Sequence, residues 1–518
     1  MSTFSLLALI SQRHVRGDPV WRPNRPFFLM VVMAVLSKEQ GITVFPICIF
    51  LEVLYCLHTS RKYTAAALRC SMLFFSALVL VFFRVYINNF TTPKFTELDN
   101  PAAFVKDPLL RIASYSCVWL INLRLLLLPY SLCFDYSMGC IPPITAWSDY
   151  RVLCLPAVAF VLIAIIYILY NTNNRLFIFG AAIGGISFLP ASNLLITVGF
   201  TVAERVLYLP SVGLCIMVAV IYVRASRYYH NMDKIGLAVL VIAMKLTYQR
   251  SEEWRTELDL YASGLRVCPE NAKIHYNLGK VLSKTGNLDA AEHNYWNAVR
   301  LNPNYEHALN NLANILESKG RSAEAEHLLR QALRKRPMFA VAWMNLGITL
   351  MNQGKYQESL EAYRKSLQLR PNDADCIFNL GNLYQRIGQP LSALEAWRNS
   401  TRLDSSHVQA VTNLLVLLDE LGRCDDVLEA AKTLPEAMLG ERGYNSISSG
   451  HMSREKCPSN AMYHANLGVL YQRWARYELA EYYYRKALSL ERNERVEFYL
   501  KEVYKKLNGT SENAKRRL

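Results

Sequence analysis

The stretch AVAWMNLGITLMNQGKYQESLEAYRKSLQLRPND, residues 340–373, is one unit of a pattern that recurs every 34 residues. An Asn-Leu pair returns at a constant position in each unit, with its asparagine at Asn277, Asn311, Asn345, Asn379 and Asn413. A proline returns at the same step, at Pro269, Pro303, Pro337 and Pro371. Helix-forming residues fill the space between the prolines, so the period indicates a stack of helix pairs.

Small residues stand where the two helices of a unit must touch. In the quoted unit these are Gly347, Ser359 and Ser366, and the large Tyr363 fills the gap one helical turn away. This is the tetratricopeptide consensus, and about six repeats are expected over residues 251–505. A polar insertion interrupts them near 440–458, and a basic tail follows at 506–518. Because no repeat buries its apolar face alone, we expect a superhelix with a concave groove.

The recurring asparagines lie on the first helix of each pair, which is the helix that lines the groove. A side-chain amide offers two donors and one acceptor. The five asparagines are therefore candidates for binding the backbone of an extended peptide. The other interpretation is that Asn-Leu-Gly belongs to the chemistry of the repeat scaffold, and the sequence leaves both open.

The first half of the chain is rich in long apolar stretches. They occur at residues 27–37, 42–57, 71–88, 111–129, 153–170, 176–190, 206–223 and 235–247. Several approach the roughly 20 residues that a membrane-spanning helix needs, and we expect about seven spans. The predicted fold is therefore all-α: a multi-spanning membrane helical domain over residues 1–250, followed by the tetratricopeptide superhelix. No cleavable signal peptide is recognisable at the start.

The charge of the first half follows its apolar stretches. Residues 1–250 carry 21 Lys and Arg against 10 Asp and Glu, a net charge of +11 out of +15 for the chain. Most of this excess flanks the apolar stretches, which is typical of membrane proteins, so no nucleic-acid partner is expected. Basic connectors at 13–25, 61–69, 175 and 224–234 should be cytosolic. The loops at 89–150 and 190–206 and the repeats then lie in the lumen, provided that 111–129 does not cross fully.

The glycosylation sequons and the cysteines give further information on whether the loops and repeats lie in the lumen. N-glycosylation sequons start at Asn89, Asn399 and Asn508, all on the predicted luminal side. The twelve cysteines include no CxxC pair and no metal-finger spacing, so no metal site is expected. Cys424 and Cys457 bracket the polar insertion and are candidates for a disulfide. For the cysteines in general, the simplest expectation is buried free thiols.

Polar clusters beside membrane segments are costly and commonly mark function. Four occur, at residues 37–41, 99–111, 135–143 and 188–211. In the last, two prolines bracket Glu204 and Arg205, and the arginine offers a fork of donors to a lipid phosphate. Lys38, in the first cluster, could serve as a point charge. The other interpretation is that Glu204 with Arg205, and Lys38 with Glu39, are structural pairs at helix ends.

Long motifs in these clusters carry a resemblance to a known family. They are SKEQGITV at 37–44, DYSMGCIP at 135–142, FLPASN at 188–193 and AERVLYLPS at 203–211. Together with the repeats they resemble the transmembrane and tetratricopeptide repeat family of O-mannosyltransferases acting on cadherins. The resemblance implies a membrane enzyme of the endoplasmic reticulum. It would transfer mannose from dolichyl-phosphate mannose to Ser or Thr of cadherin domains that the repeats present, with that lipid as substrate and no other cofactor.

The resemblance also suggests roles for particular residues. Inverting transfer needs a base for the hydroxyl proton and a cation for the leaving phosphate. The candidates for the donor phosphate are Arg205 and Lys38, followed by Arg111. We expect Glu204 and Glu39 to orient the basic groups, and Asp135 to shape the acceptor side.

One departure from the family concerns the catalytic base. Members of the family carry more membrane helices before SKEQG, and an acidic pair in their first luminal loop is expected to supply the base. This sequence begins near the segment that precedes SKEQG, so it is interpreted as an N-terminally truncated form without those residues. The alternative is a non-enzymatic, membrane-anchored repeat scaffold that binds luminal client or calcium-handling proteins.

Overall fold

The computed structural model describes residues 13–15, 18–22, 25–59, 63–90, 95–172, 174–194, 196–421, 423, 426, 461–473 and 477–515. It divides into two compact units, Met1–Pro303 and Asn304–Leu518. The polar insertion at 440–458, Cys424 and Cys457 lie outside the described residues, so their predicted disulfide stays a prediction. The described part of the chain is helical apart from one short antiparallel hairpin, β1 (Arg13–Val15) and β2 (Asp18–Arg22).

Each apolar stretch of the first half forms a helix. They are α2 (Arg25–Ser37), α3 (Val44–Thr59), α4 (Tyr63–Ile87), α5 (Pro108–Leu127), α6 (Cys154–Asn171), α7 (Arg175–Phe188), α8 (Tyr208–Ala225) and α9 (Met232–Glu253). Short 3-10 turns lie between them: η1 (Glu39–Thr43), η2 (Pro101–Phe104), η3 (Tyr150–Leu153), η4 (Leu189–Ala191) and η5 (Glu204–Val206). The predicted all-α fold is confirmed for this half.

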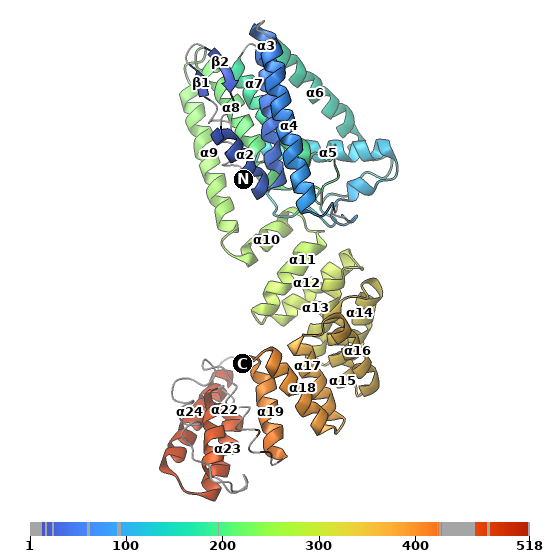
Figure 1. The fold of residues 1–518 in the computed structure, drawn as a ribbon, viewed down its shortest axis with the longest axis vertical. Helices are drawn as coiled ribbons and strands as arrows, with labels where there is room; N and C mark the ends of the chain where they lie inside the picture. The colour runs from blue at the N-terminus through green and yellow to red at the C-terminus, as the bar shows by residue number, and fades with distance from the viewer. Residues whose placement is uncertain are drawn as a thin grey trace. The chain divides into compact units, whose positions relative to one another are not determined.

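Four of these segments are long and apolar enough to cross a membrane by length and composition. They are Tyr63–Ile87, Pro108–Leu127, Tyr150–Asn171 and Tyr208–Ala225. Helices α2, α3 and α7 are apolar but shorter than 18 residues. The described residues thus contain fewer full-length spans than the about seven expected from the roughly 20-residue rule. In Figure 1, α5 runs across the direction of α4, and the expectation that 111–129 does not cross fully stays a prediction.

Close packing between helices in this unit relies on glycine. Gly213 of α8 and Gly180 of α7 face each other so closely that a Cβ on either would collide with the other's backbone oxygen. Small residues at a crossing are typical of membrane helices, whose backbones must approach each other to gain contact energy. Gly41 plays the same part in SKEQG, because a Cβ there would collide with the backbone of Ala34. The glycines therefore fix the turn of η1 and the α7–α8 contact.

The repeat helices begin with α10 (Glu257–Val267) and continue as pairs. The pairs are α11 (Ala272–Lys284) with α12 (Leu288–Leu301), α13 (Glu306–Ser318) with α14 (Ser322–Lys335), α15 (Ala340–Asn352) with α16 (Tyr356–Leu369), and α17 (Ala374–Arg386) with α18 (Pro390–Leu403). Then come α19 (Val408–Glu420), α22 (Ala461–Arg473), α23 (Tyr477–Leu490) and α24 (Glu494–Lys515). The quoted 34-residue unit is the α15–α16 pair, as its period predicts.

The consensus positions explain why each pair closes. Tyr363 is fully buried, and its ring lies against Gly347, where an added Cβ would come within 2.6 Å of a ring carbon. Trp397 packs on Gly381 in the same way. Ser359 donates a hydrogen bond to the Gly347 carbonyl at 2.7 Å, which ties the two helices together. Filling this space with any larger residue would force strain into a close-packed core.

Candidate functional site

Three loops of the first unit meet at one place. We call residues 96–101, 132–144 and 188–206 the three-loop cluster. Asn100 is fully buried and donates from its amide to the Asn193 side-chain oxygen and to the Val198 carbonyl, both at 2.9 Å. The Met138 amide donates to the Leu98 carbonyl at 3.2 Å, and Trp119 of α5 donates to the Ser192 carbonyl at 2.8 Å. Three of the four polar clusters in the sequence are thus brought together.

Glu204 belongs to this cluster and contacts residues that are distant in the sequence. One carboxylate oxygen accepts from the Cys133 amide at 2.7 Å and from the Tyr136 hydroxyl at 3.0 Å. The other forms an ion pair at 3.2 Å with Arg250 of α9. Burial raises the pKa of the Glu204 carboxyl, although Arg250 and the hydrogen bonds oppose the change. The contacts of Glu204 therefore join loop 132–144 to α9, whereas its proposed orientation of Arg205 stays a prediction.

Asp135 joins the cluster to the first repeat. Its carboxylate accepts from the Ser137 hydroxyl at 2.6 Å and pairs with the Lys273 ammonium of α11 at 2.6 Å. Its carbonyl accepts from the side chain of Asn271, the N-cap of α11, at 3.0 Å. Burial works against the charged carboxylate, but the bonds from Lys273 and Ser137 outweigh it, so the pKa of Asp135 is lowered. Asp135 thus acts in a structural joint, and its predicted role toward an acceptor is untested.

A disulfide and a tight turn complete this joint. Cys140 is bonded to Cys268, which lies just before the first repeat proline. Directly before Cys140, Gly139 has φ of +103°, and a Cβ there would come within 2.6 Å of the Glu270 carbonyl oxygen. The Ala272 amide at the start of α11 donates to the Met138 carbonyl at 3.3 Å. These contacts hold residues 135–140 against the beginning of the repeats, within one compact unit.

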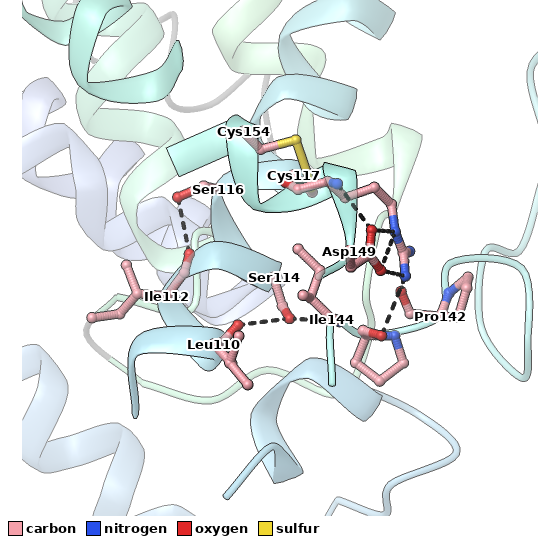
Figure 2. Close-up of a disulfide and its surroundings, with 11 residues drawn as sticks. Leu110, Ile112, Ser114, Ser116, Cys117, Pro142, Ile144, Asp149 and Cys154 are labelled. Carbon is pink, nitrogen blue, oxygen red and sulfur yellow. Dashed lines mark hydrogen bonds and ion pairs between the residues drawn. A yellow bond between two sulfur atoms is a disulfide. The ribbon is translucent and has the colours of Figure 1, made fainter. Parts of the chain in front are cut away.

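A second disulfide braces α5 against α6. Cys117 of α5 is bonded to Cys154, the first residue of α6 (Figure 2). Beside it, the Arg151 guanidinium pairs with Asp149 at 2.6 Å and donates to the Pro142 carbonyl at 2.8 Å. For these four cysteines the expectation of free thiols was wrong, because long-range packing brings each pair together. Among the residues that the structure describes, Cys56, Cys70, Cys133, Cys215 and Cys376 form no disulfide.

The predicted phosphate-binding residues lie on separate elements. Arg205 is exposed on η5, and within the described part of the chain its side chain makes no hydrogen bond or ion pair. Arg111, in the first turn of α5, donates to the Val105 carbonyl at 3.0 Å. Lys38 precedes η1 and is half-buried. The side chain of Glu39 lies outside the described residues, so its predicted orienting role stays a prediction.

The five repeat asparagines are partly engaged in the scaffold. Asn345 is 7 % exposed and donates to the Asn310 side chain of the preceding repeat at 2.9 Å. Asn413 donates to Asn382 at 3.1 Å, and Asn379 donates to the Asp375 carbonyl one turn back at 2.9 Å. Asn277 and Asn311 are half-buried. The amides of Asn345 and Asn413 therefore link neighbouring repeats, and the use of the five asparagines in binding a peptide backbone stays a prediction.

The sequons differ in accessibility. Asn89 is exposed just after α4, where a positive φ of 50° places it in a turn. Asn399 is half-buried in the middle of α18, next to the fully buried Ser400, which is a poor position for a bulky glycan. The side chain of Asn508 lies outside the described residues. Asn89 is therefore the better topological marker.

The sequence analysis did not identify Arg250, Lys273 or the Cys140–Cys268 pair. These residues form most of the contacts between the three-loop cluster, α9 and the first repeat. One signal was available: Cys268 directly precedes the repeat proline Pro269, and Cys140 lies in a motif on the same predicted side of the membrane. No group of three or more metal-ligating side chains was found among the residues that the structure describes.

Comparison with known proteins found family models that match segments in both halves of the chain. A family model described as Protein O-mannosyl-transferase TMTC, DUF1736, matches residues 89–164, the stretch that holds α5, loop 132–144 and both cysteines of the Cys117–Cys154 disulfide. Tetratricopeptide models match residues 272–305, 310–374, 362–395 and 463–494. The chain is similar to the TMTC protein O-mannosyl-transferases over part of its length. The family resemblance of the sequence motifs is thereby confirmed.

Individual TMTC relatives match a large part of this chain. Protein O-mannosyl-transferase F38B6.6 of Caenorhabditis elegans is 45% identical over 306 residues, which are 59% of this chain and 42% of that protein. TMTC4 of Mus musculus is 38% identical, over 50% of this chain and 39% of that protein. TMTC3 of Homo sapiens is 32% identical, over 58% and 36% respectively. The chain thus spans less than half the length of these TMTC proteins.

Solved structures with similar repeats include MamA and the Pseudomonas aeruginosa protein PilF. MamA is 20% identical, with 30% of this chain and 90% of that chain covered and a TM-score of 0.27. PilF is 19% identical, with 45% and 97% covered and a TM-score of 0.30. At these TM-scores the superpositions carry no argument, and the repeat assignment stands on the sequence period, the helices and the family models.

Proposed function

We propose that this chain acts in protein O-mannosylation at the endoplasmic reticulum membrane. Mannose would pass from dolichyl-phosphate mannose to Ser or Thr of cadherin-type proteins, with no further cofactor. The observation that carries the proposal is the match of residues 89–164 to the TMTC family model, together with relatives named protein O-mannosyl-transferase. The membrane helices and the repeats are the two parts that such a reaction needs, one for a lipid donor and one for a protein acceptor.

The disulfides support a luminal position for the loops and the repeats. Cys117, Cys154, Cys140 and Cys268 all lie on the side that the charge pattern assigns to the lumen. Disulfides form and persist in oxidising compartments such as the endoplasmic reticulum and are rare in the cytosol. A cytosolic first repeat would leave Cys140–Cys268 in a reducing environment.

The joint at Asp135 suggests how an acceptor would be positioned. Lys273, Asn271 and Cys268 at the start of the repeats are bonded directly to residues 135–140. A protein held by the first repeat would therefore keep a fixed relation to the three-loop cluster. Holding two reactants in a defined geometry lowers the entropic part of the barrier. Exposed Arg205 is an available cation for a leaving phosphate, and we assign no residue of this chain as the base.

A non-enzymatic scaffold is the second candidate function. It is favoured by the contacts of Asp135 and Glu204, since both carboxylates are occupied by structural hydrogen bonds and ion pairs. Such a protein would use the joint to hold luminal clients near the bilayer without transferring sugar. The two candidates differ in whether mannose appears on the client.

The discriminating experiment is mannosylation of cadherin ectodomains in cells that lack their endogenous O-mannosyltransferases. Rescue by the 518-residue chain, and loss of that rescue with Arg205→Ala at equal abundance, is the result expected for an enzyme. Clients that co-purify with the chain but carry no mannose would refute transfer and leave the scaffold. Mapping the glycan at Asn89 reports the topology in the same cells.

A further inference from the structure

A cavity of about 300 Å³ lies against one face of α5. Along α5 it is lined by Ser114, Cys117, Val118, Leu120, Ile121 and Arg124. These positions follow the three- and four-residue steps of a single helical face. Its volume lies at the lower end of the range for small-ligand pockets. The cavity is within the stretch 89–164 and the neighbouring loop, yet neither proposed function assigns it a role.

Most of the wall is apolar, and the polar groups at one end are already used. Ile141, Pro142, Pro143 and Ile144 close the side opposite α5. The Ser114 hydroxyl donates to the Leu110 carbonyl and accepts from the Ile144 amide, both at 2.9 Å, as Figure 2 shows. Arg151, also in the wall, is neutralised by Asp149. This end of the cavity therefore offers a ligand no spare charge.

The other end carries an uncompensated charge. Arg124 lies in the last turn of α5, and its side chain is exposed. Its guanidinium lies 5.7 Å from the centre of the Tyr130 ring, a cation–π contact that leaves its N–H donors available. No carboxylate forms an ion pair with Arg124 in the described part of the chain. Ten residues separate Ser114 from Arg124, so the apolar stripe is about 15 Å long.

Part of the surface of α5 consists of exposed apolar side chains. Ile112 and Leu127 on α5 are 45% and 55% exposed, and Leu128 just beyond it is 59% exposed. These outward apolar side chains belong to a helix that is apolar enough to enter a membrane. A ligand that reaches the cavity from the bilayer would bring an apolar chain and a polar head. The arginine at one end selects an anionic head, because a guanidinium binds phosphate oxygens in bidentate fashion.

We propose that this cavity binds the phosphate-bearing end of a membrane lipid. The phosphate lies on the Arg124 guanidinium, and the adjoining hydrocarbon packs against Val118 and Ile121. Two lipids have this chemistry: an isoprenoid phosphate, which is the type of carrier in the proposed transfer reaction, and an ordinary anionic phospholipid. In the first case the site deepens the proposed function and rests on it. In the second the site is a lipid anchor for the luminal loops.

The test measures lipid retention and not sugar transfer. The full chain is purified in phosphatidylcholine nanodiscs that contain polyisoprenyl phosphate, phosphatidic acid or neither, and native mass spectrometry counts the retained lipid. Arg124→Gln should lower retention about tenfold, which is the loss expected for one charge-assisted contact. Ala102→Phe, which fills the cavity wall, should lower it similarly. The matched control is Arg255→Gln, an exposed arginine paired with Glu252, which should retain lipid normally.

Folding of each variant is checked through protection of the four disulfide cysteines from maleimide. Retention of polyisoprenyl phosphate alone identifies the carrier lipid, and equal retention of phosphatidic acid identifies a phospholipid. Unchanged retention in both folded cavity variants overturns the site, as does displacement of the lipid by inorganic phosphate alone. A chain that retains lipid but transfers no mannose refutes only the proposed function. A chain that transfers mannose without retention refutes only this site.

Discussion

Helices α6 and α16 are both apolar on at least one face, but α6 leaves most of its apolar side chains exposed whereas α16 buries a large aromatic one. In α6 only Val158 is buried, while Phe160 and Ile166 are 73% and 65% exposed. In α16 the large Tyr363 is fully buried between small residues. The repeat helix obtains its stability from contacts within the chain. The membrane helix leaves its apolar side chains to the lipid, so polar contacts and disulfides must fix the loops between such helices.

The difference is clearest at the joint between the two kinds of structure. In the repeats, packing of apolar side chains determines where the next helix lies. Around Asp135, Glu204 and Cys140, by contrast, position is set by ion pairs, backbone hydrogen bonds and a disulfide. Four substitutions compare these two modes of stabilisation, beginning with the largest expected effect.

Tyr363→Ala tests packing inside a repeat. Removing a fully buried aromatic side chain leaves a cavity beside Gly347 and should destabilise the repeats by about 4 kcal/mol. The measurement is urea unfolding of the purified chain, followed by circular dichroism. Met338→Ala, at a side chain that is 73% exposed, is the control and should change stability by less than about 0.5 kcal/mol. Equal effects of the two substitutions would contradict the packing argument.

Cys268→Ser tests the covalent part of the joint. Loss of the Cys140–Cys268 bond frees a loop closed across a sequence separation of 128 residues and should cost about 3 kcal/mol. We expect faster proteolysis between α9 and α11 in detergent-solubilised chain, with the later repeats unaffected. Cys215→Ser, at an exposed free cysteine, should leave the cleavage pattern unchanged. Identical protection in both variants would mean that the noncovalent contacts suffice.

Glu204→Ala tests the polar centre of the three-loop cluster. It leaves the Cys133 amide, the Tyr136 hydroxyl and Arg250 without this acceptor and should cost about 2 kcal/mol. Glu204→Gln keeps an acceptor oxygen and should cost less than half as much. A loss in the glutamine variant as large as that in the alanine variant would show that the charge, and not the acceptor, is essential.

The pH dependence of the same site has a defined sign. Burial raises the pKa of Glu204 in the folded protein above its model-peptide value of 4.5. The folded state therefore binds this proton more readily than the unfolded state, and stability should rise as the pH falls through the range just above 4.5. Glu204→Gln should lack this increase. Thermal unfolding of the two proteins across this pH range measures it.

Glu326→Gln tests one ion pair within α14, to Arg330, and one to the next repeat, to Lys355, and should have the smallest effect. Glu326 pairs with Arg330 and Lys355, both at 2.8 Å. Burial opposes its charge, but these bonds outweigh that cost and lower the pKa of Glu326 from 4.5 to about 2. Its contribution is present above pH 4.5 and is lost as the pH falls toward 2. Because Arg330 and Lys355 are more than 40% exposed, the substitution should cost less than about 1 kcal/mol at neutral pH.

Much of the fold could be predicted from local pattern. The 34-residue period predicts the helix pairs, because each pair repeats the same small and large positions, as Gly347 and Tyr363 show. The apolar stretches predict the helices of the first half one by one. The number of full spans was less predictable, because α2, α3 and α7 are apolar but shorter than 18 residues.

The candidate site was predicted only in outline. The polar clusters at 99–111, 135–143 and 188–211 were recognised as candidates, and they do meet. Their partners were not recognised, because Arg250 and Lys273 lie 46 and 138 residues from the carboxylates that they contact. Charge adjacency suggested Glu204 with Arg205, whereas the backbone turn of η5 directs Glu204 into the cluster and leaves Arg205 in solvent.

The sequence by itself determined the two kinds of structure in this protein, namely apolar helices suited to a bilayer and a regular stack of helix pairs. It could do so because both follow from short-range periodicity of side-chain size and polarity. Only the tertiary structure decided that Cys140 pairs with Cys268, that Asp135 binds the first repeat, and that one face of α5 borders a cavity. Those features depend on which distant segments share space, and that is set by the packing of the whole unit.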